Sequence, residues 1–112
     1  MEWELVKLEI HTPREFVEPL RDALNALGAC RVGAYDHVVS FGETQGFWRP
    51  LEGSHPYDGS VGELSQGTEC RMDVRCPAAL VERAVAAIRA IHPYEEPLIN
   101  VVPLLNGRWE TI

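Results

Sequence analysis

Basic residues and long apolar segments are scarce in this sequence of 112 residues. Lysine and arginine together number 10 against 17 aspartates and glutamates, which gives a formal net charge of −7. An acidic chain repels a phosphate backbone, so neither DNA nor RNA is an expected partner. There is no apolar run of about 18 residues, and the start, Met1 to Glu4, lacks the basic and apolar parts of a signal peptide. We therefore expect a cytoplasmic protein that does not associate with membranes.

Cysteine is also sparse, and its spacing excludes the usual cysteine sites. Cys30, Cys70 and Cys76 are odd in number and form no C-x-x-C motif. This argues against a disulfide framework and against a thiolate zinc site. Cys76 falls just before an expected helix, where amide dipoles can lower a thiol pKa. No sequence neighbour supplies a base, so a small core residue is the favoured interpretation over a nucleophile.

The composition is that of a globular protein. Hydrophobic residues make up 46% and charged residues 24%, which predicts a single domain over residues 1–112. A core of this size gives modest stability, so additional burial between subunits is expected. The aromatic residues Trp3, Trp48 and Trp109, expected to be exposed, also favour a closed homo-oligomer.

The chain contains an internal repeat. Residues 7–13 match residues 71–77 type for type, at a constant offset of 64 positions (77 − 13). The match continues from Val17 and Glu18 to Val81 and Glu82. The sequence therefore predicts two copies of one strand–helix–strand unit.

Each unit begins with a strand in which apolar and charged residues alternate. This pattern predicts a sheet with one face covered by helices and one polar face. Pro13 and Pro77 stand where the helices should begin. Pro19 would interrupt the first helix, so we expect a bend or a late start there. Gly28 should end the first helix and Pro93 should mark the end of the second.

A return strand is expected after each helix, over residues 31–41 and 98–105. Two β-α-β units that share one sheet form an α+β ferredoxin-like sandwich, with both helices on one side and the return strands at opposite edges. Residues 42–67 between the units hold six of the nine glycines. We therefore expect an elaborated loop or hairpin there.

The segment 46–62 is the first candidate site, because it combines aromatic residues, Arg49, Gly53 and His55 with further glycines. In a functional interpretation, backbone amides and the Arg49 guanidinium hold an anion. The favoured alternative is a subunit-contact loop with glycines at left-handed turns.

The second candidate is the turn His92-Pro93-Tyr94-Glu95-Glu96-Pro97. His92 near the end of a helix is expected to favour its charged form, because terminal carbonyls carry partial negative charge. Adjacent glutamates point to opposite faces, so at most one readily joins His92 at a metal. A rigid turn with solvated carboxylates is favoured over a metal site.

Three stretches, residues 33–37, residues 48–53 and residues 92–97, carry a resemblance to a known family. They resemble the small PII-like or CutA-like domain inserted in bacterial Nif-three-like dimetal proteins, over nearly the whole chain. The resemblance implies a ferredoxin-like fold and a tendency to form trimers, without an established activity. Val38 and Val39 stand in the region where a cysteine often occurs in the family, which puts thiolate ligation there in doubt. The dimetal domain has no counterpart in these residues, so its chemistry is not expected.

We therefore expect a non-catalytic, oligomeric binding or regulatory module, with a homotrimer favoured over a dimer and no required cofactor. It would bind a small ligand or a protein partner in a cleft, most simply between subunits. The expected ligand-binding residues are Tyr35, His37, Arg49, Gly53, His55, His92, Tyr94, Glu95 and Glu96. Two alternatives are a divalent-metal protein with ligands His37, His55, His92 and Glu95, and a hydrolase-like enzyme with a site between subunits.

Overall fold

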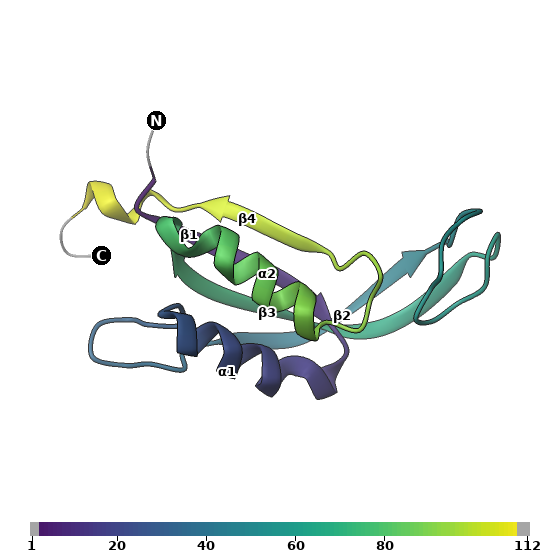
Figure 1. Ribbon diagram of the computed structural model, residues 1–112, viewed down its shortest axis with the longest axis horizontal. Helices are drawn as coiled ribbons and strands as arrows, with labels where there is room; N and C mark the ends of the chain where they lie inside the picture. Colours follow the sequence, from purple (N-terminus) through teal and green to yellow (C-terminus); the bar gives the residue numbers. More distant parts are fainter. Residues whose placement is uncertain (1–2, 110–112) are drawn as a thin grey trace.

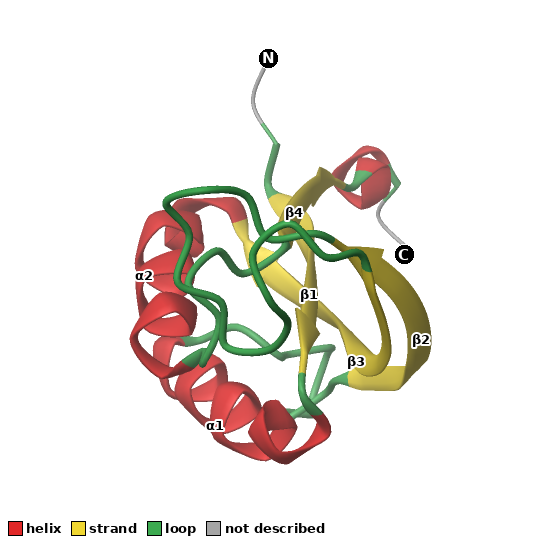
Figure 2. Cartoon of the chain, turned by 90° about the vertical axis from the view of Figure 1, so that its right-hand side faces the viewer, coloured by secondary structure: helices red, strands yellow, loops and turns green. Residues whose placement is uncertain are grey.

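The computed structural model describes residues 3–109 and contains one four-stranded antiparallel sheet with two helices. The sheet order is β2-β3-β1-β4, and both helices cover the same face (Figures 1 and 2). This confirms the ferredoxin-like α+β fold and the placement of the return strands at opposite edges. The elements are β1 (Leu5–Thr12), α1 (Val17–Leu27), β2 (Ser40–Trp48), β3 (Ser65–Pro77), α2 (Val81–Ile91) and β4 (Ile99–Pro103).

The two helices start at positions that differ by the same offset as the two repeats. α1 begins at Val17 and α2 at Val81, and each follows a three-residue 3₁₀ turn whose N-cap is a proline, Pro13 or Pro77. Pro19 is the third residue of α1, where a backbone N–H has no intrahelical acceptor. Because α1 starts late, Pro19 removes no intrahelical hydrogen bond. At 11 residues each, α1 and α2 are too short to cross a membrane, and no other helix in residues 3–109 could do so.

The core lies between the helices and one face of the sheet. Every second residue of β1 is buried, and the same alternation occupies the second half of β3. Burying a large apolar side chain such as leucine or isoleucine contributes roughly 1.5–3 kcal/mol to the stability of the fold. The largest fully buried side chains include Leu8, Ile10, Leu20, Leu24, Met72 and Ile88.

The other face of the sheet, called here the open face, carries charged residues at the centre. Glu9 lies directly opposite Asp73 in the pairing of β1 with β3, and these two are equivalent positions in the repeat. A pseudo-twofold axis therefore passes between them. The Lys7–Glu9 contact of 3.0 Å has its equivalent in the Arg71–Asp73 contact of 3.1 Å. These pairs offset the repulsion of two facing carboxylates.

The predicted first return strand is wrong in position. Residues 31–41 were expected to be extended, but β2 shares only Ser40 and Phe41 with that range. Residues 31–39 form a loop because Cys30 and His37 both adopt left-handed backbone angles, with φ of 65° and 57°. The turn is held by Asn25, whose Oδ1 accepts the His37 N–H at 2.8 Å.

The glycine-rich segment is mostly a hairpin. β2 and β3 pair as far as Trp48 and Ser65, well past the end of β1 at Thr12, and the connecting loop spans residues 49–64. Gly46 faces Gly67 across the hairpin, and a Cβ at Gly67 would lie 3.0 Å from the Trp48 ring. The hairpin extends the molecule to 49 Å in its longest dimension (Figure 1).

Replacing Gly28 by alanine is expected to destabilise the fold. Gly28 ends α1 with φ of 105°, and a Cβ there would lie 3.3 Å from Leu80 Cδ1. A left-handed residue with a Cβ costs about 1–2 kcal/mol. Urea unfolding of Gly28→Ala should show this loss. Gly42→Ala is the control, because its Cβ meets nothing within 4 Å; its change should stay within about 0.5 kcal/mol.

Candidate functional site at the loop and the turn

Residues 49–64 and residues 92–97 meet at one end of the molecule, and we call them together the loop–turn site (Figure 1). The backbone N–H of His55 donates to Glu95 Oε2 at 2.7 Å. The rings of Tyr57 and Tyr94 lie 5.6 Å apart between centroids, tilted by 49°. One chain therefore brings the two candidate segments together without a neighbouring subunit.

Glu69 of β3 holds the turn of residues 92–97 in place. Tyr94 donates its hydroxyl hydrogen to Glu69 Oε2 at 2.9 Å, and His11 Nδ1 lies 3.2 Å from Glu69 Oε1. The sequence motifs single out neither His11 nor Glu69 as a site residue. The alternation of polar and apolar residues in β3 indicates on which face of the sheet Glu69 lies. The side chains that Glu69 contacts follow only from the register of β3 with β1.

His92 is a structural residue in this chain. It is 7% exposed and caps α2 with an extended backbone. Tyr94 N–H donates to His92 Nδ1 at 3.1 Å, and His92 Nε2 lies 2.6 Å from the His11 carbonyl oxygen. The accepting Nδ1 carries no hydrogen, so these contacts assign the neutral ring with its proton on Nε2. Burial lowers the His92 pKa from 6.5, more than the His11 carbonyl raises it. The expectation of a charged His92 is therefore wrong.

Tyr94 is held as a neutral phenol. Burial is the largest cause that raises its pKa, and the hydrogen bond to Glu69 raises it further. A phenol that is difficult to ionise and an imidazole with both nitrogens engaged are poorly suited to proton transfer near neutral pH. The arrangement is suited to rigid support of the turn.

The loop itself folds over Trp48. Gly53, Gly59 and Gly62 all have positive φ, at 92°, 97° and 83°. The Trp48 indole N–H donates to the carbonyl oxygen of Asp58 at 3.0 Å, and a Cβ at Gly59 would lie 2.9 Å from that nitrogen. Glycine is needed here both for the backbone angle and for the close approach of the indole.

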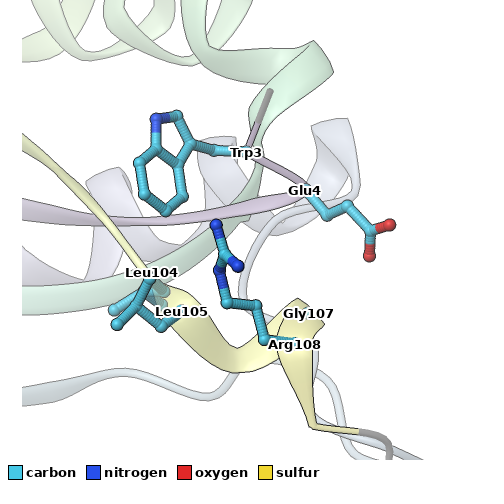
Figure 3. Close-up of a pocket in the computed structure, with 6 residues that line it drawn as sticks. All are labelled: Trp3, Glu4, Leu104, Leu105, Gly107 and Arg108. Atoms are coloured by element: carbon cyan, nitrogen blue, oxygen red, sulfur yellow. The ribbon is translucent and has the colours of Figure 1, made fainter. Parts of the chain in front are cut away.

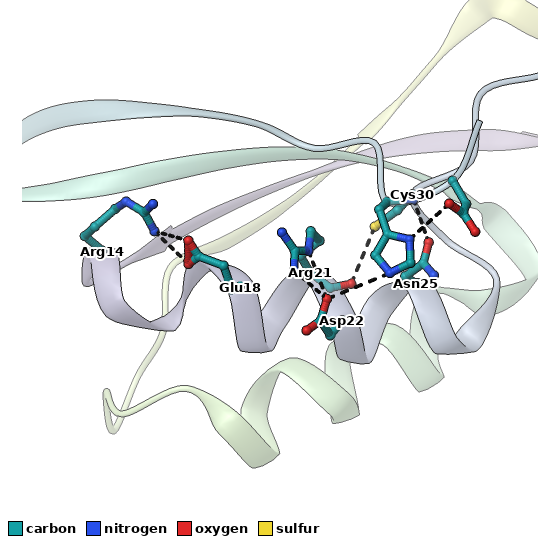
Figure 4. Close-up of polar contacts among 8 residues, drawn as sticks. Arg14, Glu18, Arg21, Asp22, Asn25 and Cys30 are labelled. Atoms are coloured by element: carbon teal, nitrogen blue, oxygen red, sulfur yellow. Dashed lines mark hydrogen bonds and ion pairs between the residues drawn. The ribbon is translucent and has the colours of Figure 1, made fainter.

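The remaining predicted residues are divided between two ends of the molecule. Arg49 and Glu96 are exposed at the loop–turn end. Tyr35, 75% exposed, and His37 belong to the loop 31–39 at the opposite end (Figure 1). His37 lies 3.0 Å from Asp36 and 3.9 Å from Asp22. Asp22 belongs to α1 (Figure 4). A single cleft that contains all of the predicted residues is not formed within one chain.

The same separation applies to the predicted metal ligands. His37 lies at one end, whereas His55, His92 and Glu95 lie at the other, and both His92 ring nitrogens are already bonded. His92 therefore does not fit as a ligand in this arrangement. Between residues 3 and 109, no three histidine, cysteine, aspartate or glutamate side chains are grouped so that they could hold a metal ion.

All three cysteines lie in the core, as expected for Cys76. Cys30 and Cys76 are fully buried, and Cys70 is 3% exposed. Burial raises the pKa of Cys30 to about 11 and also raises that of Cys76. The alternative of a Cys76 thiolate activated by the helix is therefore wrong.

Two hollows open elsewhere on the surface. One of about 140 Å³ lies near Trp3 and Arg108, with Leu104 and Leu105 beside them (Figure 3). A larger one of about 250 Å³ lies between the loop 31–39 and the open face. Neither is lined by any of the predicted site residues.

The buried neutral His92 predicts a loss of stability in mild acid. Its folded pKa lies below 6.5, so the unfolded chain binds more protons below that pH and the free energy of unfolding falls. The contribution is complete above pH 6.5 and is lost as the pH falls to the folded pKa. Denaturant unfolding at about pH 7.5 and about pH 5 should show the loss, and His92→Gln should reduce it.

His55→Gln is the control for this experiment, since His55 is exposed and contacts Glu95 through its backbone N–H. It should keep the full pH dependence of the native sequence. An equal pH dependence in His92→Gln and the native sequence would contradict the role given to His92.

Comparison with curated proteins finds relatives much longer than this chain. The chain is 35% identical over 100 residues to a GTP cyclohydrolase 1 type 2 homolog of Bacillus subtilis (strain 168), and 36% identical over 102 residues to that of Mycobacterium tuberculosis (strain ATCC 25618 / H37Rv). These matches cover 89% and 91% of the chain but only 27% of each relative. No family model matches the sequence.

Solved structures agree with the fold. A Bacillus cereus protein related to NIF3 superposes with a TM-score of 0.80 at 33% identity, over 93% of this chain and 26% of that one. The divalent ion tolerance protein CutA1 from Ehrlichia chaffeensis gives 0.70 at 22% identity, over 100% and 92%. The PII-like protein CutA from Nostoc sp. PCC 7120 gives 0.67 at 17%, over 92% and 84%. The chain therefore has the CutA/PII-like fold and matches a small domain of the NIF3-related proteins, as the sequence resemblance predicts.

Proposed function

We propose that this chain is a non-catalytic, self-assembling binding module whose loop–turn site takes a basic segment of a partner protein. The observation that carries the proposal is the hydrogen bond from His55 N–H to Glu95. It fixes an exposed, glycine-rich loop against a rigid turn, and exposed loops held on a firm scaffold are a common form of binding site.

The charge of the site favours a cationic partner. Arg49 is the one arginine or lysine in the loop and turn, against five acidic residues, so the anion cradle considered from the sequence is disfavoured here. An acidic surface attracts a basic partner and repels nucleotides and nucleic acids. The acidic residues of the loop and turn are Glu52, Asp58, Glu63, Glu95 and Glu96.

The aromatic residues suit an arginine in particular. Tyr57 is 55% exposed and leans against Tyr94, which Glu69 holds in place. A guanidinium can stack on such a ring and pair with a neighbouring carboxylate, here that of Asp58, in one pose. Lysine lacks the planar group that makes both contacts at once.

The proposed module is non-catalytic because His92 and Tyr94, two polar residues of the turn, are poorly suited to proton transfer. His92 is neutral with both ring nitrogens bonded, and the Tyr94 pKa is raised. Neither group is available as an acid or base in one chain. A metal centre or a hydrolase site would need donors from a second copy. The name of the E. chaffeensis neighbour motivates measuring the metal content of purified protein, and stoichiometric metal would favour that alternative.

Self-assembly is supported by apolar surface beside unpaired strand edges. β2 and β4 have free outer edges in the described chain. Trp48 and Trp109 are exposed as expected, at 37% and 52%, whereas Trp3 is only partly exposed. A trimer is the favoured closed form, on the basis of the PII-like and CutA-like resemblance, with a dimer as the alternative.

Sedimentation velocity over a range of concentrations tests the assembly. The expected result is one species with three times the chain mass of 12.6 kDa. Burying exposed apolar side chains against copies of the chain supplies the driving force. A monomer at every concentration would contradict self-assembly.

A fluorescent hexaarginine peptide is a suitable probe of the loop–turn site. Fluorescence anisotropy should detect binding that weakens with added salt, because surface charge pairs are screened. Glu52→Gln combined with Glu95→Gln should weaken binding by about tenfold, the loss of about 1.4 kcal/mol. A hexaglutamate peptide should not bind.

Glu82→Gln is the matched control, because Glu82 is exposed at the start of α2, away from the site. It should bind the arginine peptide as the native chain does. Equal weakening by Glu82→Gln would indicate attraction to the net charge alone and would remove the proposed site.

A further inference from the structure

The larger hollow has a defined lining at the end of the molecule opposite to the loop–turn site. It lies where the loop 31–39 passes the open face of the sheet, and it has a volume of about 250 Å³. Its wall combines basic, hydroxyl and aliphatic groups. The lining residues used below are Lys7, Val32, Val38, Ser40, Asp73 and Arg75.

The hollow exists because β2 starts late. Ser40 is the first residue of β2 and lies opposite Asp73 of β3. Arg75, two residues further along β3, therefore has no β2 residue opposite it. The chain nevertheless stays close, since Cys30 N–H donates to the Arg75 carbonyl oxygen at 3.0 Å and Val38 N–H donates to the Cys30 carbonyl oxygen at 2.9 Å. The loop is thereby held beside the sheet edge without covering it.

Arg75 carries a charge that no neighbour balances. On the open face, Lys7 and Arg71 both contact Glu9, at 3.0 Å and 3.5 Å, and Arg71 also contacts Asp73. Two cations and two carboxylates thus form a neutral group. Arg75 lies directly opposite Lys7 and has no carboxylate within 4.0 Å among residues 3–109.

The repeat explains why Arg75 has no partner. Its equivalent in the first unit is His11, which contacts Glu69. The pseudo-twofold axis relates Glu69 to Leu5, so the position that would hold a carboxylate beside Arg75 holds an aliphatic residue instead. A half-buried guanidinium beside another cation favours a carboxylate supplied from outside the chain.

We propose that this hollow binds a small organic carboxylate with a short aliphatic chain. The Arg75 guanidinium takes the carboxylate in a two-point contact, and the Ser40 hydroxyl lies in the same wall to donate a hydrogen bond. Val32 and Val38, 40% and 37% exposed, provide the apolar wall for the chain of the ligand. This site is separate from the loop–turn site and does not depend on its function.

Titration of ¹⁵N-labelled protein with sodium butyrate, followed by NMR at constant ionic strength, tests the proposal. The amides of Val38, Ser40 and Arg75 should shift in a saturable manner. Arg75→Gln should weaken butyrate binding by about tenfold or more, because it removes a charge-assisted, two-point contact. Leu5→Glu should weaken binding too, since it gives Arg75 the internal carboxylate that Glu69 gives His11.

Three controls keep the interpretation specific. Arg83→Gln removes an exposed charge from α2 and should leave binding unchanged. 1-Butanol, which has the chain without the charge, and inorganic phosphate, which has charge without the chain, should both bind more weakly than butyrate.

Several results would overturn the proposal. Butyrate binding that Arg75→Gln leaves intact would remove the site, and phosphate binding as strong as that of butyrate would reduce it to a site for any anion. If butyrate causes no shifts while Arg75→Gln changes the native mass, the occupant is a carboxylate of a second copy of the chain.

Discussion

The antiparallel pairing of β1 with β3 is the constraint on which the rest of the structure depends. These are the equivalent strands of the two repeat units, and Glu9 faces its own counterpart Asp73 across the pseudo-twofold axis. This register directs the apolar residues of both strands to the same face, so α1 and α2 cover one core. A shift by one residue would turn the charged row of one strand into that core. The central ion pairs therefore matter more for register than for net stability, since exposed pairs contribute little.

Both candidate sites lie where the two units stop being equivalent. At the helix ends, Gly28 terminates α1 with a left-handed turn, whereas His92 terminates α2 by bonding Tyr94 and the His11 carbonyl. On the open face, His11 has the carboxylate of Glu69, whereas its equivalent Arg75 has Leu5 at the corresponding position. Folding requires the shared pattern of both units. The departures from it leave one end with an exposed acidic loop and the other with an unbalanced guanidinium.

The sequence predicts those features that local chemistry determines. The helix ends, the two sheet faces and a bend or late start at Pro19 follow from periodicity and from the proline amide. The helix starts were expected at Pro13 and Pro77, but each helix begins four residues later, after a 3₁₀ turn. β2 was misplaced because Val38 and Val39 look like strand residues, and the left-handed turn at His37 is held by Asn25, a tertiary contact. The hairpin was expected as a loop or hairpin, but glycines in its strands hide the extent of pairing, since Gly67 serves to accommodate Trp48. Glu69 was missed because its role needs the register.

β3 physically connects the two ends of the molecule. It supplies Glu69 to the loop–turn site and Arg75 to the hollow, both on the open face. They are six positions apart along the strand, roughly 20 Å at about 3.3 Å per residue, which is too far for direct contact. Between them lie Arg71 and Asp73, which contact each other, and Arg71 also contacts Glu9. Residues 70–73 of the strand are paired on both sides, so this stretch is a stiff spacer. It holds the acidic site and the basic hollow at fixed separation, and a partner or second copy that engages both must match that spacing.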